Sequence, residues 1–151
     1  MLIKLITVGK IKEKYFRDAI DEYAKRITKY SKIEIIELND SSLSDNLAVN
    51  KEGIDILKHI SKNDYVITLS INGKELNSIE LANTIDNILN TNSTITFIIG
   101  GSYGISDDVR KISNLDISFS KLTFPHKLFR VILLEQIYRS FKILNNESYH
   151  K

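Results

Sequence analysis

The segment TITFIIGGSYG, residues 94–104, indicates the fold class of this chain. It begins with a near-continuous apolar run, Thr94 to Ile99, which predicts a strand that is buried on both faces of a sheet. Glycines follow at positions 100, 101 and 104, and glycine lets a backbone turn tightly and approach a ligand closely. A buried strand that runs into such a loop is typical of a parallel sheet, whose ligands bind beyond the carboxyl ends of the strands.

Strands and helices alternate along the rest of the chain. Apolar runs predict further strands at Leu2–Gly9, Ile33–Leu38, Tyr65–Ile71 and Ile117–Phe119. Apolar residues at helical spacing predict helices at Tyr15–Tyr30, Leu47–Ile60, Leu76–Leu89 and Lys127–Leu144, and Ser106 can cap a further short helix. Asn39–Asp45 is expected to be a loop, and Asn72-Gly73 is expected to form a turn. This order predicts an α/β fold with a mostly parallel sheet flanked by helices.

The length of 151 residues, with no repeat or long linker, predicts a single domain over residues 1–151. The hydrophobic fraction of 42% and the charged fraction of 26% are ordinary for a globular protein in water. The chain has no cysteine, which excludes disulfides, thiolate nucleophiles and cysteine-based metal sites. The N-terminus has no signal-peptide pattern and no apolar run could span a membrane, so we expect a cytoplasmic protein without a membrane partner.

Charge is distributed unevenly along the chain, although the net charge is only +2. Residues 1–32 hold nine Lys or Arg and four Asp or Glu, a net +5, and residues 121–151 hold six and two, a net +4. The middle of the chain is therefore acidic, at −7 by difference. The two basic ends could form one face that binds a polyanion, while a solvated surface is an equal alternative on charge alone.

Three loops are the candidates for a ligand site. The loops after Leu69, Ile99 and Phe119 would lie together at the carboxyl edge of a parallel sheet. The second loop has the pattern GGxxG, which matches neither the dinucleotide-binding pattern GxGxxG nor a phosphate-binding P-loop. The third carries Pro125, the only proline, which suits the start of the following helix. A small-molecule site built from backbone groups is the functional interpretation, and ordinary turns and connections are the alternative.

The last predicted helix is apolar almost all round. At about 100° per residue, one face gathers the apolar residues Phe129, Leu133, Leu134, Ile137, Phe141 and Leu144. Such a helix must be buried broadly, either in the core or at a dimer interface. Arg130 lies within the apolar arc, where it would either extend its charged end to water or be presented into a shared site.

The chain ends with ESYHK, residues 147–151, which has two interpretations. It is either a frayed terminus or a tail in which Tyr149 stacks on a base and Lys151 contacts phosphate. The three histidines lie on separate predicted elements without metal-ligand spacing, so no metal site is predicted.

The segments FIIGGSYG, KLTFPHKLFRVILLEQIYRSFKI and ESYHK together resemble the RlmH family, which are SPOUT-class methyltransferases acting on large-subunit ribosomal RNA. The resemblance includes the opening LIKLITVGKIKEKYFRDAIDEYAKRI and the central LSINGKELNSIELA, so it covers nearly the whole chain. These motifs are specific in combination, and their order agrees with the family. Residues within the motifs vary in kind, such as Ser102 and Tyr103 between the glycines.

The resemblance implies a SPOUT-type α/β-knot fold with a C-terminal trefoil knot, a rare exception to unknotted topology. It implies a homodimer that holds S-adenosyl-L-methionine in the knot near the partner subunit. The implied reaction is methylation of N3 of a pseudouridine, position 1915 of 23S rRNA, in the large subunit or assembled ribosome. Carried over by motif, the cofactor contacts would be Leu69, Gly100, Phe119, Ser120, Lys121, Leu122, Thr123 and Phe124.

The same reaction suggests candidate catalytic residues. N3 of pseudouridine must lose a proton, so a base or a nearby cation is needed. The candidates are His150 as base or proton acceptor, Arg139 or Arg130 for charge, and Tyr149 for stacking. A Gly100→Val change is expected to block cofactor binding by filling the space where the backbone approaches the ligand.

Three alternatives stay open at the level of sequence. The first is a SPOUT-like methyltransferase with another RNA target, and the second is a non-catalytic ribosome-binding protein that keeps the fold. The third is a small nucleotide-binding protein of the flavodoxin type, against which the missing phosphate motif argues.

Overall fold

The computed structural model describes all 151 residues. Five strands form one sheet: β1 (Leu2–Val8), β2 (Lys32–Leu38), β3 (Tyr65–Glu75), β4 (Thr94–Ile99) and β5 (Leu115–Ser118). The strand order is β2-β1-β4-β3-β5, and every neighbouring pair is parallel. The predicted parallel α/β sheet is thereby confirmed. The order differs from the 2-1-3-4-5 order of flavodoxin-like proteins, which argues against the flavodoxin alternative.

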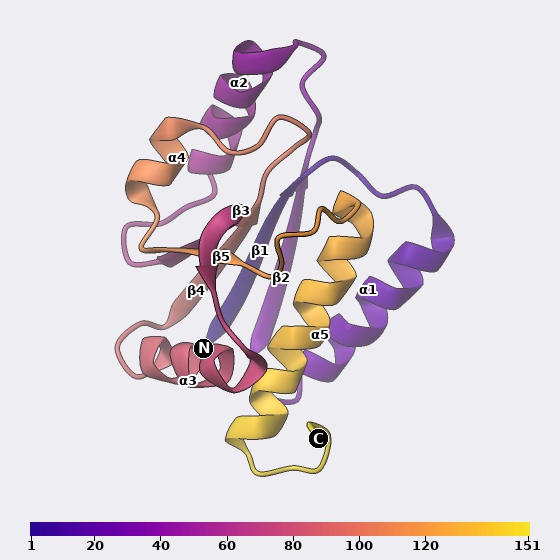
Figure 1. Ribbon diagram of the computed structural model, residues 1–151, viewed down its shortest axis with the longest axis vertical. Helices are drawn as coiled ribbons and strands as arrows, with labels where there is room; N and C mark the ends of the chain where they lie inside the picture. The colour runs from indigo at the N-terminus through magenta and orange to yellow at the C-terminus, as the bar shows by residue number, and fades with distance from the viewer.

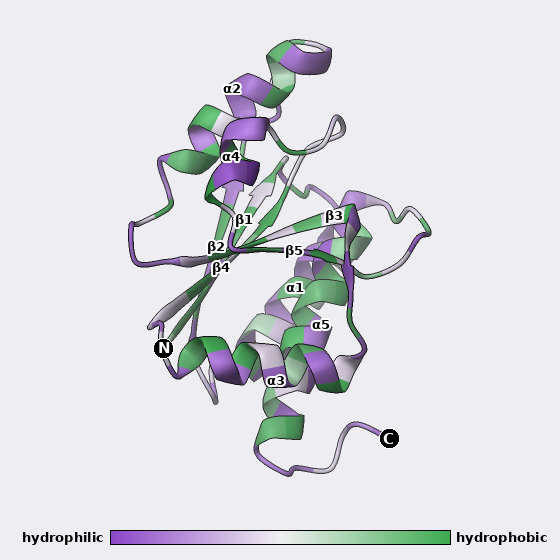
Figure 2. Ribbon diagram, turned by 60° about the vertical axis from the view of Figure 1, so that its left-hand side comes forward, coloured by the Kyte–Doolittle hydropathy of each residue, from purple (hydrophilic) through white to green (hydrophobic).

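Helices cover both faces of the sheet (Figure 1). The five helices are α1 (Lys14–Ile27), α2 (Asp45–Leu57), α3 (Ser78–Leu89), α4 (Asp107–Ile112) and α5 (His126–Leu144). The larger core lies between the sheet and α1, α3 and α5, and the smaller core lies between the sheet and α2 and α4. In Figure 2 the strands between these helical layers are largely hydrophobic, as expected for a parallel sheet covered on both faces.

Helix starts follow the capping chemistry of the sequence. The Ser106 side chain accepts a hydrogen bond from the backbone N–H of Val109, which confirms the predicted cap of a short helix. Asn77 and Glu80 form a reciprocal capping box, so α3 begins at Ser78 rather than at the predicted Leu76. The other helices differ from their predicted bounds by one to three residues.

The predicted turn at Asn72-Gly73 is wrong, because β3 continues through it to Glu75. Leu69 and Lys74 both pair with Ile117 of β5, so the residues between them bulge out of the ladder. A Cβ atom at Gly73 would lie 2.5 Å from the backbone carbon of Ile117. Glycine therefore serves the close approach of two strands here, and the bulge turns residues 70–72 toward the carboxyl edge of the sheet.

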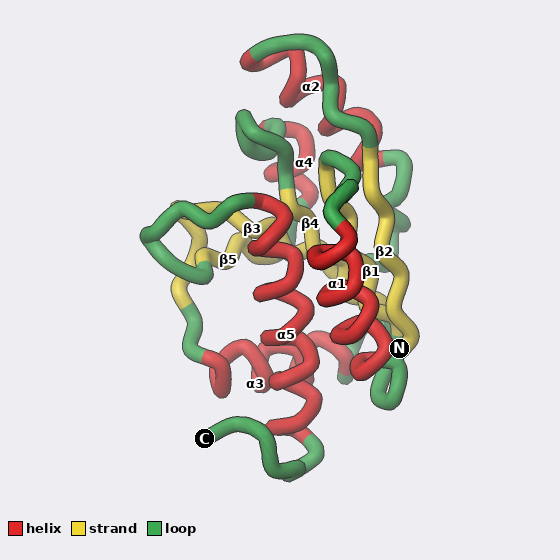
Figure 3. The backbone as a smooth tube through the Cα atoms, turned by 90° about the vertical axis from the view of Figure 1, so that its right-hand side faces the viewer, coloured by secondary structure: helices red, strands yellow, loops and turns green.

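Helix α5 lies beside α1 and crosses α3 on the same face of the sheet (Figure 3). Its inner face is in the core, where Leu133, Leu134, Ile137 and Phe141 are almost completely buried. Its outer face remains partly open, since Leu128 is 40% exposed and Val131 and Ile132 are half-buried. None of the helices is long and apolar enough to cross a lipid bilayer.

Candidate active site

A pocket of about 330 Å³ lies at the carboxyl edge of the sheet, where the bulge of β3 at residues 70–72 meets the loops after β4 and β5. Because these strands are parallel, their carboxyl ends share one edge, as the sequence predicted. Seven of the eight predicted cofactor contacts line this pocket: Leu69, Gly100, Phe119, Ser120, Leu122, Thr123 and Phe124. Lys121 does not line it, and this residue is exposed.

The glycine loop after β4 is held by its own backbone. The N–H of Gly104 donates to the carbonyl of Gly101 at 3.0 Å, and Gly104 has φ +93°, which favours glycine. A Cβ atom at Gly100 would lie 2.5 Å from the carbonyl oxygen of Gly104. A side chain at Gly100 would therefore push the loop apart rather than fill the ligand's space, which corrects the reason given for the Gly100→Val expectation.

The loop after β5 is also ordered by local contacts. The hydroxyl of Ser118 donates to the carbonyl of Ser120 at 3.0 Å, and the hydroxyl of Ser120 accepts from the N–H of Leu122 at 3.0 Å. Phe124 stacks on Phe129 of α5 with ring centroids 6.2 Å apart. These contacts preorganise a wall of backbone groups and aromatic rings for a ligand.

The pocket lining is mostly apolar with a few polar groups, as is usual for small-molecule sites. Arg110 of α4 and His126 are its only ionisable side chains. Ser70, in the β3 bulge, donates to Asp116 Oδ2 at 2.5 Å. Sequence reasoning missed Arg110, His126 and the bulge residues, and the glycine at position 73 was the one available signal for the bulge.

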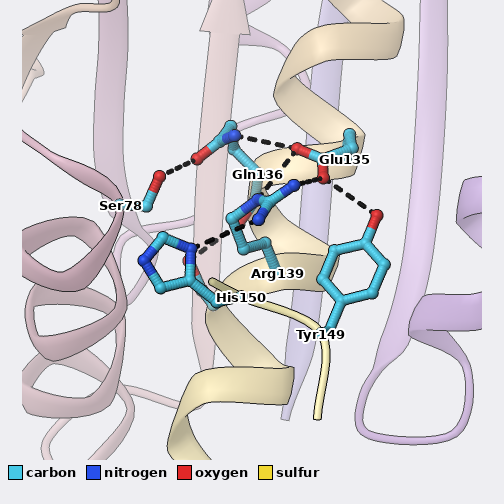
Figure 4. Close-up of polar contacts among 7 residues, drawn as sticks. Ser78, Glu135, Gln136, Arg139, Tyr149 and His150 are labelled. Carbon is cyan, nitrogen blue, oxygen red and sulfur yellow. Dashed lines mark hydrogen bonds and ion pairs between the residues drawn. The ribbon is translucent and has the colours of Figure 1, made fainter.

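The second predicted group of residues lies on α5 and the tail (Figure 4). Arg139 Nη2 donates to Glu135 Oε1 at 2.5 Å, and the Tyr149 hydroxyl donates to the same oxygen at 2.9 Å. Arg139 Nη1 lies 3.2 Å from His150 Nδ1, and its guanidinium lies 4.8 Å from the Tyr149 ring centre. Gln136 joins the cluster, since it donates to Glu135 Oε2 at 2.8 Å and accepts from Ser78. The structure therefore brings Arg139, Tyr149 and His150 together.

The tail is bound rather than frayed. The Glu147 carboxylate accepts hydrogen bonds from Lys142 at 2.7 Å, from the Tyr30 hydroxyl at 2.8 Å and from Lys29 at 3.2 Å. These donors, Lys142 foremost, lower the pKa of Glu147 to about 2. Burial and the hydrogen bond to Glu135 raise the pKa of Tyr149 to about 12, so this phenol stays protonated.

The pocket and the α5–tail cluster lie at opposite ends of α5. His126 at the start of the helix lines the pocket, and Arg139 follows thirteen residues later. That spacing corresponds to roughly 20 Å at 1.5 Å per residue. One chain therefore does not bring its predicted cofactor residues and its predicted catalytic residues into one site.

Arg130 takes neither of its two predicted roles. Its side chain is 3% exposed, so it does not extend to water, and it does not line the pocket. Its Nη2 donates to the carbonyls of Val8 and Gly9, each at 2.8 Å, and its Nη1 donates to Glu37 Oε2 at 2.9 Å. Arg130 therefore fixes the segment that follows β1.

Comparison with known proteins shows what this chain is similar to. A family model described as "Predicted SPOUT methyltransferase" matches residues 1–150. A protein of Methanococcus maripaludis is 54% identical, and the alignment covers 100% of both chains. Proteins of the Langeland and Okra strains of Clostridium botulinum are 52% identical, again over 100% of both chains, and each is named ribosomal RNA large subunit methyltransferase H.

Proposed function

The chain belongs to the SPOUT methyltransferase family and, within it, to the RlmH rRNA methyltransferases, and from this premise we propose its substrate and site. The protein transfers a methyl group from S-adenosylmethionine to N3 of a pseudouridine in 23S rRNA, and its substrate is the assembled ribosome. One observation carries the proposal: a single pocket gathers seven of the eight motif residues in a chain that matches the family over its full length.

The pocket fits the proposed cofactor. Its volume of about 330 Å³ is in the range of small-molecule sites, and Phe119, Phe124 and Phe129 offer apolar surface for a planar base. Backbone groups of the glycine loop and of Phe119–Phe124 would bind the polar edges of that base. When bound, the cofactor supplies an activated methyl group, and the protein supplies orientation and electrostatics.

A homodimer with shared sites explains the separation along α5. The outer face of α5 leaves Leu128, Val131 and Ile132 incompletely covered, and a second copy could cover them. If two α5 helices pack antiparallel about a two-fold axis, the end of one lies beside the start of the other. The Arg139, Tyr149 and His150 cluster of one subunit would then reach the pocket of its partner.

The cluster also suggests how a proton leaves N3. A guanidinium only donates, so its contact with His150 leaves Nδ1 as the acceptor and places the ring proton on Nε2. Arg139 would stabilise negative charge that develops on the uracil ring, as preorganised cations do. His150 would accept the N3 proton after it exchanges its contact with Arg139 for one with the substrate.

Membership of the SPOUT family also favours a particular fold and cellular context. The whole chain forms one SPOUT domain, and the segment from β4 to α5 carries the trefoil knot. The convergence of the β3, β4 and β5 segments on one pocket supports this topology. The protein acts in the cytoplasm, where assembled ribosomes are found.

The first experiment is calorimetric titration of the protein with S-adenosylmethionine and S-adenosylhomocysteine. We expect saturable binding of one molecule per subunit, followed by methylation of ribosomes at a single pseudouridine that mass spectrometry can map. Isolated large subunits and assembled ribosomes are compared as substrates. Absence of both binding and methylation would refute the proposal, and a different modified nucleotide would refute its target.

The shared site is tested with mixed dimers. One variant, Gly100→Val, has a broken pocket, and the other lacks residues 149–151. Each alone should be inactive, although the truncated variant should still bind S-adenosylmethionine. Random mixing gives mixed dimers with one complete site, so activity should return to about a quarter of the wild-type value. No recovery would place both halves of the site in one chain.

A further inference from the structure

A loop outside the pocket carries two lysines that have no acidic partner. It follows β1 and reads Gly9-Lys10-Ile11-Lys12-Glu13-Lys14-Tyr15, and we call residues 9–15, which include the first two residues of α1, the basic loop. Lys10 and Lys12 are exposed and take part in no ion pair or side-chain hydrogen bond, and Tyr15 is 67% exposed. Two unpaired lysines and an exposed aromatic ring close together form a typical nucleic-acid-binding surface.

The charges of the basic loop oppose the local electrostatics. Helix α1 begins at Lys14, has no acidic residue in its first turn, and receives no side-chain cap from Glu13. A helix start carries partial positive charge and is stabilised by acidic residues, so the unpaired Lys10 and Lys12 just before it raise the free energy of the folded protein, whereas Lys14 pairs with Asp18 at 2.6 Å. Such an unfavourable arrangement is expected where the positive charge serves a partner.

The basic loop is held rigidly despite its exposure. Buried Arg130 donates to the carbonyls of Val8 and Gly9, and the Glu37 carboxylate accepts from both Arg130 and the N–H of Ile11, each at 2.9 Å. Ile11 itself is 5% exposed and anchors the loop in the protein. A fixed loop loses little conformational freedom when its lysines bind, which favours a defined contact.

The basic loop lies beside the candidate active site. Strands β1 and β4 are parallel neighbours, so the loop after β1 lies at the same edge of the sheet as the pocket. Figure 1 shows this segment above α1, next to the start of α5. Lys127 Nζ lies 2.6 Å from Glu13 Oε1, and the neighbouring His126 lines the pocket. An RNA that enters the pocket would therefore extend over the basic loop.

We propose that the basic loop is a contact surface for the ribosomal RNA backbone, in which Lys10 and Lys12 bind phosphates and Tyr15 packs against a base or ribose. The inference rests on the proposed function, because it takes the RNA substrate from it. Each phosphate contact adds about 0.7 to 0.9 to the slope with which the logarithm of affinity falls against the logarithm of salt concentration. At about 0.15 M salt, two such contacts therefore strengthen binding roughly 20-fold over binding without them.

The test compares ribosome binding by the wild type, by Lys10→Ala/Lys12→Ala, and by the control Lys32→Ala/Lys62→Ala. Lys32 and Lys62 are also exposed and unpaired, but Lys32 begins β2 and Lys62 precedes β3, so both lie at the opposite edge of the sheet. We expect about 20-fold weaker binding and a salt slope lower by about 1.5 for the first variant only. A Tyr15→Ala variant should weaken binding without changing the slope.

Equal binding by the two double variants would overturn the inference, and so would the absence of ribosome binding by the wild type. Loss of the dimer in the Lys10→Ala/Lys12→Ala variant would assign the loop to a subunit contact instead, and would also overturn it. Binding does not require catalysis, so the two proposals can be separated. Lysine-dependent binding by a protein that neither binds S-adenosylmethionine nor methylates ribosomes would refute only the proposed function.

Discussion

Replacing Gly100 with alanine should weaken S-adenosylmethionine binding by about 30-fold. The new Cβ would lie 2.5 Å from the carbonyl oxygen of Gly104 and 2.8 Å from the Cγ1 atom of Ile105. A flexible side chain could move away, but the Gly104 oxygen belongs to the backbone of the tight glycine loop. Overpacking of this kind costs about 1–3 kcal/mol. If the loop opens to relieve the clash, binding must close it again at a cost in the middle of this range, about 2 kcal/mol. That cost raises the dissociation constant about 30-fold.

The assay is calorimetric titration with S-adenosylmethionine, together with thermal unfolding of the free protein. Gly9→Ala is the matched control, because Gly9 also has a positive φ, +94°, but does not line the pocket. That strain, about 1–2 kcal/mol, should be similar with and without ligand. The control should therefore unfold at a lower temperature with nearly unchanged affinity. A Gly100→Ala protein with wild-type affinity and wild-type unfolding temperature would refute the steric reasoning.

Three further changes test other parts of the structure. Burial raises the pKa of Glu52 above its ordinary 4.5. The folded protein therefore favours the protonated carboxyl, and it loses this part of its free energy of unfolding as pH rises through the raised pKa. Glu52→Gln should therefore unfold at a higher temperature than the wild type at pH 8, with a smaller difference at pH 4. Arg130→Met should cost about 3 kcal/mol in urea unfolding, because it leaves the carbonyls of Val8 and Gly9 without this donor and removes the ion pair with Glu37. The pKa of Glu147 is lowered to about 2 because its carboxylate holds the tail. The tail should therefore be fully bound above pH 4.5 and released as pH falls toward 2. The NMR signals of Tyr149 should report this release.

Much of the candidate site could be predicted because Gly100 and Phe119 follow strand ends and Leu69 directly precedes the bulge of β3. In a parallel sheet all carboxyl ends share one edge, so an order of strands is enough to place Leu69, Gly100 and Phe119 near one another. Lys121 could not be excluded in this way, because the direction of a loop side chain depends on local backbone contacts. Arg110 and His126 were missed for a related reason, since each lies in a helix whose angle to the sheet is set by packing.

The amino-acid sequence by itself determined the alternation of strands and helices, the parallel sheet, the capped start at Ser106 and the apolar character of α5. These features depend on the period of apolar residues and on short-range capping, which a sequence records directly. Only the tertiary structure decided that β3 runs past Gly73, that Arg130 is bound to the carbonyls of Val8 and Gly9, and that Arg139 lies far from the pocket of its own chain. Each of these depends on which distant segments meet, and contacts across more than a hundred residues are set by the packing of the whole molecule rather than by local pattern.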